Sequence, residues 1–280
     1  MQSILATPTA STTPGISTTL GMHFARRPDP VTRPALPDAA APVPTPVGGE
    51  RERIAATLAQ IDSALKPQRS MVHAGDVLYA AGSPATRLYI LNAGFVKLVN
   101  ASADGRSQVV GLKLRGDWLG FDGIASGHYT SEAVAMDTGE VWSFSYQDLL
   151  AAAATRPALM AMLCEAMSRE ITRDRDCLMS VCTLPSDARV ADFLAGWAES
   201  QHQASQGLRA DRIWLHMTRA DIGNFLGLTL ETVSRALSRL QRSGLIAFEG
   251  KSRRDIRIPN LQALALHALQ CSTPRTDTLQ

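Results

Sequence analysis

Apolar residues in the segment 218–242 recur at helical spacing and predict two short helices joined by a tight turn. Thr218, followed three residues later by Asp221, is a helix start signal in which side chains satisfy free backbone N–H groups. Gly227 is expected to end the first helix, because glycine tolerates the left-handed backbone needed there. Thr229 is placed to cap the second helix. The pattern predicts a helix-turn-helix.

The second predicted helix, 230–242, divides into a buried and an exposed stripe. The buried stripe is Val233, Ala236, Leu237 and Leu240. The exposed stripe is Glu231, Ser234, Arg235, Ser238 and Arg242. A helix-turn-helix inserts the first turns of its second helix into the major groove of DNA, where a carboxylate accepts from cytosine and a guanidinium forks onto guanine.

An ordinary helical hairpin with a solvated polar face is the alternative, and the local charge helps to decide. Residues 211–260 carry nine Lys and Arg against five Asp and Glu, a net charge of +4 in a chain whose total is only +2. A locally basic motif on a near-neutral chain is typical of a protein that reads DNA.

Between Ser70 and Phe144 the pattern changes to short alternating segments that predict β-strands. These segments are 77–79, 88–91, 95–99, 108–114, 132–136 and 141–144. Glycines separate them at turn-like intervals, and Asp104-Gly105 is typical of a hairpin turn. Many short strands with glycine turns predict an antiparallel barrel or roll.

A helix is predicted over 51–66, and a long one follows Pro157 with a heptad seam. The seam is Met160, Cys164, Met167, Ile171, Asp174, Leu178 and Val181. A helix packed in its own core is the alternative, but a dimer interface is favoured because a palindrome-reading module needs two copies. Asp174 would then face its own copy and repel it, with the flanking Arg173 and Arg175 partly offsetting the repulsion.

The C-terminal region predicts a helix over 185–204, a polar loop over 201–211 and, after the recognition helix, a β-hairpin with the basic turn Lys251-Ser-Arg-Arg. Such a hairpin makes a winged helix whose tip lies against phosphates. A short helix over 261–269 is expected to close the fold.

Composition bounds the remaining possibilities. Nine of the fifteen prolines fall in the first 49 residues, a Pro-, Thr-, Ala- and Ser-rich stretch with little to bury, for which disorder is expected. No apolar run is long enough to span a bilayer and no secretory signal is evident, so a cytoplasmic protein is expected. The four cysteines form no CxxC pair, and reduced thiols are expected.

The order of roll, long helix and winged helix-turn-helix resembles the CRP/FNR superfamily of bacterial transcription regulators over about residues 52–270. Met217–Arg235 is similar to the recognition segment of the FNR branch, and Gly116–His128 to its roll. In that branch the E-x-x-S-R pattern reads TTGAT-type half-sites, which implies that role for Glu231, Ser234 and Arg235. The arginine that precedes this glutamate in the CRP branch is Leu230 here, which favours the FNR-type site.

The departures from the family bear on cofactors. Oxygen-sensing members hold a 4Fe–4S cluster with three N-terminal cysteines and one in the roll, but this chain has no cysteine before Cys164, and Trp142 stands at the roll position. The segment after Gly116 lacks the arginine that holds the phosphate of cyclic AMP. No cofactor is therefore expected. His73 or His128 as a haem ligand, and Cys177 or Cys182 as a redox sensor, are retained as weaker hypotheses.

The sequence thus predicts an α+β protein with an N-terminal antiparallel β-roll like a cyclic-nucleotide-binding domain, a long dimerisation helix and a C-terminal winged helix-turn-helix. The expected divisions are a tail over 1–50, the roll over 51–155, the dimerisation helix over 156–184, the DNA-binding domain over 185–271 and a tail over 272–280. The residues expected to contact DNA are Thr218, Arg219, Thr229, Glu231, Thr232, Ser234, Arg235, Arg239, Lys251 and Arg253.

The predicted function is a homodimeric transcription regulator that binds palindromic double-stranded DNA. The resemblance implies activation through contacts of RNA polymerase with the Asp104-Gly105 hairpin of the roll and with the DNA-binding domain. A regulator of the same fold gated by a cyclic nucleotide or haem is the first alternative. An enzyme is not expected, because the sequence has no nucleophile elbow, phosphate-binding loop or paired carboxylates.

Overall fold

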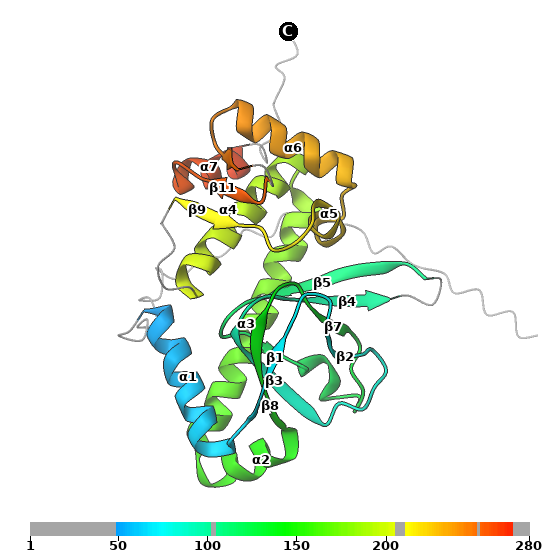
Figure 1. Cartoon of the computed structure of the whole chain (residues 1–280), viewed down its shortest axis with the longest axis vertical. Coiled ribbons are helices and arrows are strands. Elements are labelled where there is room, and N and C mark those ends of the chain that lie inside the picture. Colours follow the sequence, from blue (N-terminus) through cyan, green and yellow to red (C-terminus); the bar gives the residue numbers. More distant parts are fainter. Residues whose placement is uncertain (1–48, 102–104, 205–210, 251–252, 271–280) are drawn as a thin grey trace, which may run out of the picture. The chain divides into compact units, whose positions relative to one another are not determined.

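The computed structural model describes residues 49–101, 105–204, 211–250 and 253–270 (Figure 1). Within these ranges, helix α1 (Glu50–Leu65) precedes a region of strands, and helices α2 (Tyr146–Thr155), α3 (Pro157–Thr183) and α4 (Ser186–Ala204) follow it. The remaining helices are α5 (Arg219–Leu226), α6 (Leu230–Arg242) and α7 (Leu261–Gln270). The long helix predicted after Pro157 is confirmed.

Two four-stranded antiparallel sheets form the roll. One has the order β1-β8-β3-β6 and the other β2-β7-β4-β5. The strands are β1 (Gln68–Val72), β2 (Val77–Tyr79), β3 (Arg87–Ala93), β4 (Val96–Ala101), β5 (Ser107–Lys113), β6 (Trp118–Leu119), β7 (Glu132–Ala135) and β8 (Gly139–Ser145), with the short helix η1 (Phe121–Gly123) after β6. The antiparallel roll predicted from the alternating segments is confirmed.

Two strands of the roll lie outside the predicted segments. Four of the five residues of strand β1 are exposed. Its sequence therefore did not need, and does not show, the alternation of apolar and polar residues that marks a half-buried strand. Strand β6 is only two residues long, and both are buried. Of the expected Asp104-Gly105 turn, Asp104 lies outside the described residues, while Gly105 has a φ of 83°, a left-handed conformation that suits glycine.

The apolar residues gather in three clusters. One lies between the two sheets and includes Leu91, Val96 and Val141. A second packs one face of α1, α2 and α3 against strands β3 and β8. The third is the core of the C-terminal region, where α4, α5, α6 and α7 meet, and Phe95, Leu112, Leu114 and Met136 of the roll also pack there. The roll and the C-terminal region therefore share apolar packing.

The C-terminal sheet has three strands, in the order β10-β11-β9, with β9 (Arg212–Trp214), β10 (Ala247–Glu249) and β11 (Asp255–Arg257). The predicted hairpin is β10–β11. The polar loop predicted from residue 201 is wrong at its start, because α4 continues to Ala204. Gln201 is only 1% exposed, and its amide donates to the Trp214 carbonyl at 2.8 Å and accepts from the Trp214 N–H at 3.1 Å.

Candidate DNA-binding surface

The turn between α5 and α6 is built as the sequence predicts. Thr218 accepts a hydrogen bond from the Asp221 N–H, and Asp221 accepts one in return from the Thr218 N–H at 3.0 Å, a complete capping box. Gly227 ends α5 with a φ of 65°. A Cβ on Gly223 would lie 2.6 Å from the Leu228 carbonyl oxygen, so a glycine there allows the turn to pass close to α5.

Helix α6 presents a sharp division between its two faces. Val233, Ala236, Leu237 and Leu240 are at most 1% exposed and hold the helix on the C-terminal core. Glu231 and Arg235 are exposed in the first two turns, with Thr232 and Ser234 half-buried beside them. Thr229 caps the helix by accepting from the Thr232 N–H at 3.2 Å. Exposed carboxylate, hydroxyl and guanidinium groups on adjacent turns can meet base edges in a major groove.

Arg219 ties the first helix to this face. Its Nη1 donates to the Ser234 hydroxyl at 3.2 Å, and its guanidinium lies 5.8 Å from the ring centroid of Phe248 in the wing. The Ser234 hydroxyl is therefore oriented by Arg219 before any DNA is bound. Sequence reasoning placed Arg219 in the contact set but did not show this link.

Arg239 is arranged differently from Arg235, although both are exposed on α6. Its Nε and Nη2 both pair with the Asp187 carboxylate of α4, so the guanidinium reaches a phosphate only by leaving that carboxylate. In the wing, Glu249 pairs with both Arg212 and Arg257. Part of the local positive charge seen in the sequence is therefore neutralised within the domain.

The tip of the wing is described only in part. Arg253 has a φ of 51°, and its guanidinium lies 5.7 Å from the Phe248 ring centroid. Lys251 lies outside the described residues. The aromatic ring of Phe248 thus lies near two arginines of the expected contact set, Arg219 and Arg253, and a ring face favours such cations.

Comparisons with known proteins bear on this surface. A Crp-like helix-turn-helix domain matches residues 188–266, and a cyclic nucleotide-binding domain matches residues 69–156. The fumarate and nitrate reduction regulatory proteins of Salmonella typhimurium (strain LT2) and Escherichia coli (strain K12) are each 36% identical to this chain over 208 residues, which is 74% of this chain and 81% of the relative. The chain belongs to the CRP/FNR family of transcription regulators.

Solved structures agree with this assignment. FixK2 from Bradyrhizobium japonicum is 28% identical, has a TM-score of 0.64, and the match covers 75% of this chain and 99% of FixK2. A CRP-family transcriptional regulator from Thermus thermophilus, at 22% identity and a TM-score of 0.59, shares the fold; its match covers 73% of this chain and 98% of the other. Because the relatives at 36% identity are transcription regulators and a Crp-like helix-turn-helix domain matches, this chain is a DNA-binding transcription regulator and not an enzyme. None of its described helices is long and apolar enough to cross a membrane.

The seam predicted on α3 lies on the surface of the single chain. Met160, Ile171 and Leu178 are 37%, 47% and 62% exposed, and Cys164 and Asp174 are also exposed. Met167 and Val181 are half-buried. Met179, outside the predicted seam, is 61% exposed as well. A row of exposed apolar side chains on one helix is typical of a surface that packs against a partner.

Arg173 differs from the sequence expectation. Its Nη1 donates to the Asp117 carboxylate at 2.5 Å, so its guanidinium is engaged by the roll and does not offset the charge of Asp174. Burial tends to lower the pKa of Arg173, but the Asp117 carboxylate, together with Glu170 and Glu50, outweighs burial and raises the pKa. In the predicted dimer, Asp174 would therefore face its own copy with less compensation than the sequence suggested.

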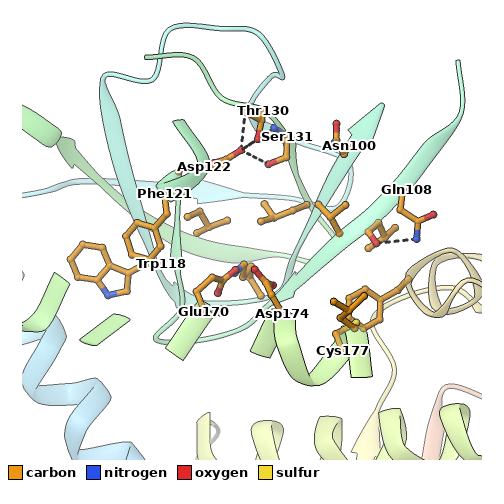
Figure 2. A pocket seen from close by; sticks show the side chains of 18 of the residues that line it. Asn100, Gln108, Trp118, Phe121, Asp122, Thr130, Ser131, Glu170, Asp174 and Cys177 are labelled. Carbon is orange, nitrogen blue, oxygen red and sulfur yellow. Dashed lines mark hydrogen bonds and ion pairs between the residues drawn. The ribbon is translucent and has the colours of Figure 1, made fainter. Parts of the chain in front are cut away.

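A cavity of about 760 Å³ lies between the roll, α3 and α5 of this CRP/FNR regulator (Figure 2). The carboxylates of Asp122, Glu170 and Asp174 line it. Among the described lining residues Lys113 is the one cation, and its Nζ pairs with Glu170. Asp122 accepts hydrogen bonds from the backbone and hydroxyl groups of Thr130 and Ser131. A phosphate in this cavity would meet three carboxylates and no unpaired cation from these residues, which disfavours a cyclic nucleotide.

The two histidines considered for haem binding, and Cys177 of the two cysteines considered for redox sensing, have ordinary surroundings. His73 is 72% exposed and pairs with Asp76, His128 is exposed, and neither lines the cavity. Burial, reinforced by Asp174 and Asp192, raises the pKa of the Cys177 thiol. A raised pKa lowers the thiolate fraction, and the thiolate is the form that oxidants attack. The structure therefore gives no support to Cys177 as a redox sensor.

Proposed function

We propose that this regulator acts as a homodimer that reads palindromic DNA with TTGAT-type half-sites, one α6 in each half-site. The observation that carries the proposal is the face of α6 in its first two turns, where Glu231 and Arg235 are exposed and Ser234 lies half-buried between them. Leu230, 47% exposed, stands just before it. The exposed seam of α3 supplies a surface for the second copy. We expect Thr218, Thr229 and Arg253 to position the domain on the DNA backbone.

Regulation at a promoter also implies a contact with RNA polymerase. The family resemblance supports polymerase as a partner of the roll and of the DNA-binding domain. Asp104, which the resemblance assigns to the polymerase contact, lies outside the described residues. The proposal for polymerase therefore rests on family membership, whereas the proposal for DNA reading rests on α6.

Replacing Arg235 by alanine is expected to weaken binding to a TTGAT palindrome by about 1–3 kcal/mol and to relax the preference at the base it contacts. The reason is the loss of a forked guanidinium contact with guanine. Fluorescence anisotropy with the palindrome, and with variants changed at each half-site base, measures both effects.

Arg242→Ala is the matched control, because Arg242 has the same charge and is exposed in the last turn of the same helix. We expect it to lower affinity equally for all duplexes. If Arg235→Ala leaves the base preference of the wild-type protein unchanged, the assignment of Arg235 to base reading is wrong.

Replacing Asp174 by alanine is expected to tighten the dimer several-fold, because two seam carboxylates brought close together repel each other. Asp174 is exposed on the seam, and Arg173 is engaged with Asp117. Sedimentation velocity over a concentration series measures the dimer dissociation constant. Asp176→Ala removes the same charge from an exposed position outside the seam and should leave that constant unchanged. Equal behaviour of the two variants would count against the seam.

A further inference from the structure

The outer edge of the roll is closed by a side chain from the DNA-binding domain. Strand β5 is the last strand of its sheet and pairs only with β4 among the described strands. Two backbone groups on this edge, the Ser107 carbonyl and the Val109 N–H, form hydrogen bonds with the side chain of Asn224 in α5. The Asn224 Nδ2 donates to the Ser107 carbonyl at 2.8 Å, and the Asn224 Oδ1 accepts from the Val109 N–H. An edge strand otherwise leaves such groups unpaired.

The chemistry of this contact explains why the residue is an asparagine. A carboxamide carries an acceptor oxygen and a donor nitrogen on the same carbon, so Asn224 takes the place of the N–H and C=O that one residue of a neighbouring strand would offer to this edge. An aspartate of the same shape would offer only acceptors and would set a carboxylate against the Ser107 carbonyl. Gln108 completes the contact, because its Nε2 donates to the Asn224 backbone carbonyl near the end of α5.

A second contact joins the same two parts of the chain. Lys97 of β4 pairs with Asp221 of α5, with 2.6 Å between Nζ and Oδ1, and the two side chains are 25% and 17% exposed. Burial tends to raise the pKa of Asp221, but the hydrogen bonds from Lys97 and Thr218 outweigh it and lower the pKa. One oxygen of this carboxylate therefore holds the roll while the other holds the capping box of α5.

A third contact lies before the helix-turn-helix. The ring of His216 stacks on Phe95, with 3.6 Å between the ring centroids, and its Nδ1 lies 2.8 Å from the Asp137 carboxylate. Phe95 and Asp137 both belong to the roll. The three contacts involve His216, which precedes α5, and Asp221 and Asn224, which lie within it. They therefore hold both α5 and the segment that leads into it.

Fixing α5 also fixes α6. Gly223 brings the backbone of the turn against α5, and Ile222 and Leu226 share one core with Val233 and Leu237 of α6. The roll in turn packs on α3, the helix with the proposed dimer seam. The direction of α6 relative to the dimer seam therefore depends on how α5 sits on β5.

We infer that Asn224, together with Lys97 and Asp221, is a positioning clamp that sets the separation of the two recognition helices in the dimer. The regulator then reads the spacing between its half-sites as well as their bases. This inference rests on the proposed palindrome-reading function. Within the clamp, the Asn224 amide is occupied by β5, so it acts on DNA through the placement of α6.

The test compares spacing with base preference. The half-site and its best spacing are first obtained by in vitro selection with the wild-type protein, so that the test does not depend on TTGAT. Affinities are then measured on duplexes with that spacing, with one base pair more or less, and with one half-site base changed. Asn224→Asp, uncharged Asn224→Leu and Lys97→Met are compared; Lys97→Met leaves the DNA-binding domain untouched.

Both Asn224 variants are expected to lower the wild-type discrimination between spacings about tenfold. Asn224→Leu loses two hydrogen bonds, and Asn224→Asp loses the donor to Ser107 and sets a carboxylate against its carbonyl oxygen. Lys97→Met should lose less spacing discrimination than the two Asn224 variants. All three variants should keep the wild-type discrimination between bases. Asn260→Asp is the control, because Asn260 caps α7 by accepting from the Ala263 N–H, which an aspartate does equally. Folding is checked by thermal melting.

Two results would overturn the clamp. Wild-type spacing discrimination in both folded Asn224 variants would show that β5 does not set the helix separation, and an equal loss of base and spacing discrimination would show a general defect of the domain. Selection of a single, non-palindromic half-site by the wild-type protein would instead reject the proposed function, and with it the clamp. Selection of a palindrome with half-sites other than TTGAT would reject only the half-site assignment.

Discussion

Replacement of Leu237 by alanine is expected to lower the free energy of unfolding by about 2–5 kcal/mol. Leu237 is 1% exposed in the middle of α6 and belongs to the core shared with α4, α5 and α7. The truncation removes apolar contacts and leaves a cavity that closely packed neighbours refill only in part. Denaturation by urea, followed by circular dichroism, measures the loss.

Leu230→Ala is the matched control on the same helix. Leu230 is 47% exposed, so its truncation should change the free energy of unfolding by less than about 0.5 kcal/mol. The two variants separate the two faces of α6: Leu237 holds the helix on the domain, and the face that follows Leu230 is the one proposed to read DNA. A similar, small effect of both truncations would contradict the division of the helix into buried and exposed stripes.

Local patterns predicted much of this structure. The capping box at Thr218, the left-handed Gly227 and the two stripes of α6 each depend on residues within a few positions of one another. Such features follow from helical periodicity and from the conformational freedom of glycine. For the same reason the strands with apolar alternation were predicted, whereas the exposed β1 was not.

The polar contacts between distant segments could not be predicted in this way. Asn224 and Gln201 each use a side-chain amide to complete the edge of a strand, and the Lys97–Asp221 pair joins residues 124 positions apart. A single sequence gives no signal for which strand edge a helix will meet. The one available indication is an amide in an otherwise amphipathic helix, which is also common on exposed faces.

Charge pairing shows the same limit on the candidate site. The sequence predicts a basic surface, but it does not show that Arg239 pairs with Asp187 or that Arg173 pairs with Asp117. These pairs form between segments that are brought together only by the fold. They decide which arginines are available to DNA or to a partner, and they leave Arg235 as the exposed arginine of the predicted base-reading set on α6.

Replacing Glu170 by alanine is expected to lower the free energy of unfolding by about 3–5 kcal/mol, because the buried ammonium group of Lys113 is left without its partner. Lys113 of β5 is only 3% exposed, and its Nζ pairs with the Glu170 carboxylate of α3, which is 24% exposed. Without that carboxylate the ammonium group has lost both water and its partner. Chemical denaturation measures the cost, with circular dichroism as the signal.

The opposite truncation provides the control. Lys113→Met leaves Glu170, which is partly exposed and can be hydrated, so its cost should be clearly smaller than that of Glu170→Ala. The double variant Lys113→Met with Glu170→Leu should recover most of the stability, because an apolar pair of similar volume replaces a buried ion pair at little cost. Equal losses in the two single variants, or no recovery in the double variant, would show that the buried charge is not the cause.

The position of this ion pair gives the prediction a functional consequence. Lys113 lies at one end of β5, and the groups that hold Asn224 lie at the other. Glu170 lies on α3, four residues before the seam residue Asp174. The same strand therefore joins the proposed dimer helix to the helix-turn-helix. If the clamp sets the separation of the recognition helices, Glu170→Ala should weaken spacing discrimination as well as stability.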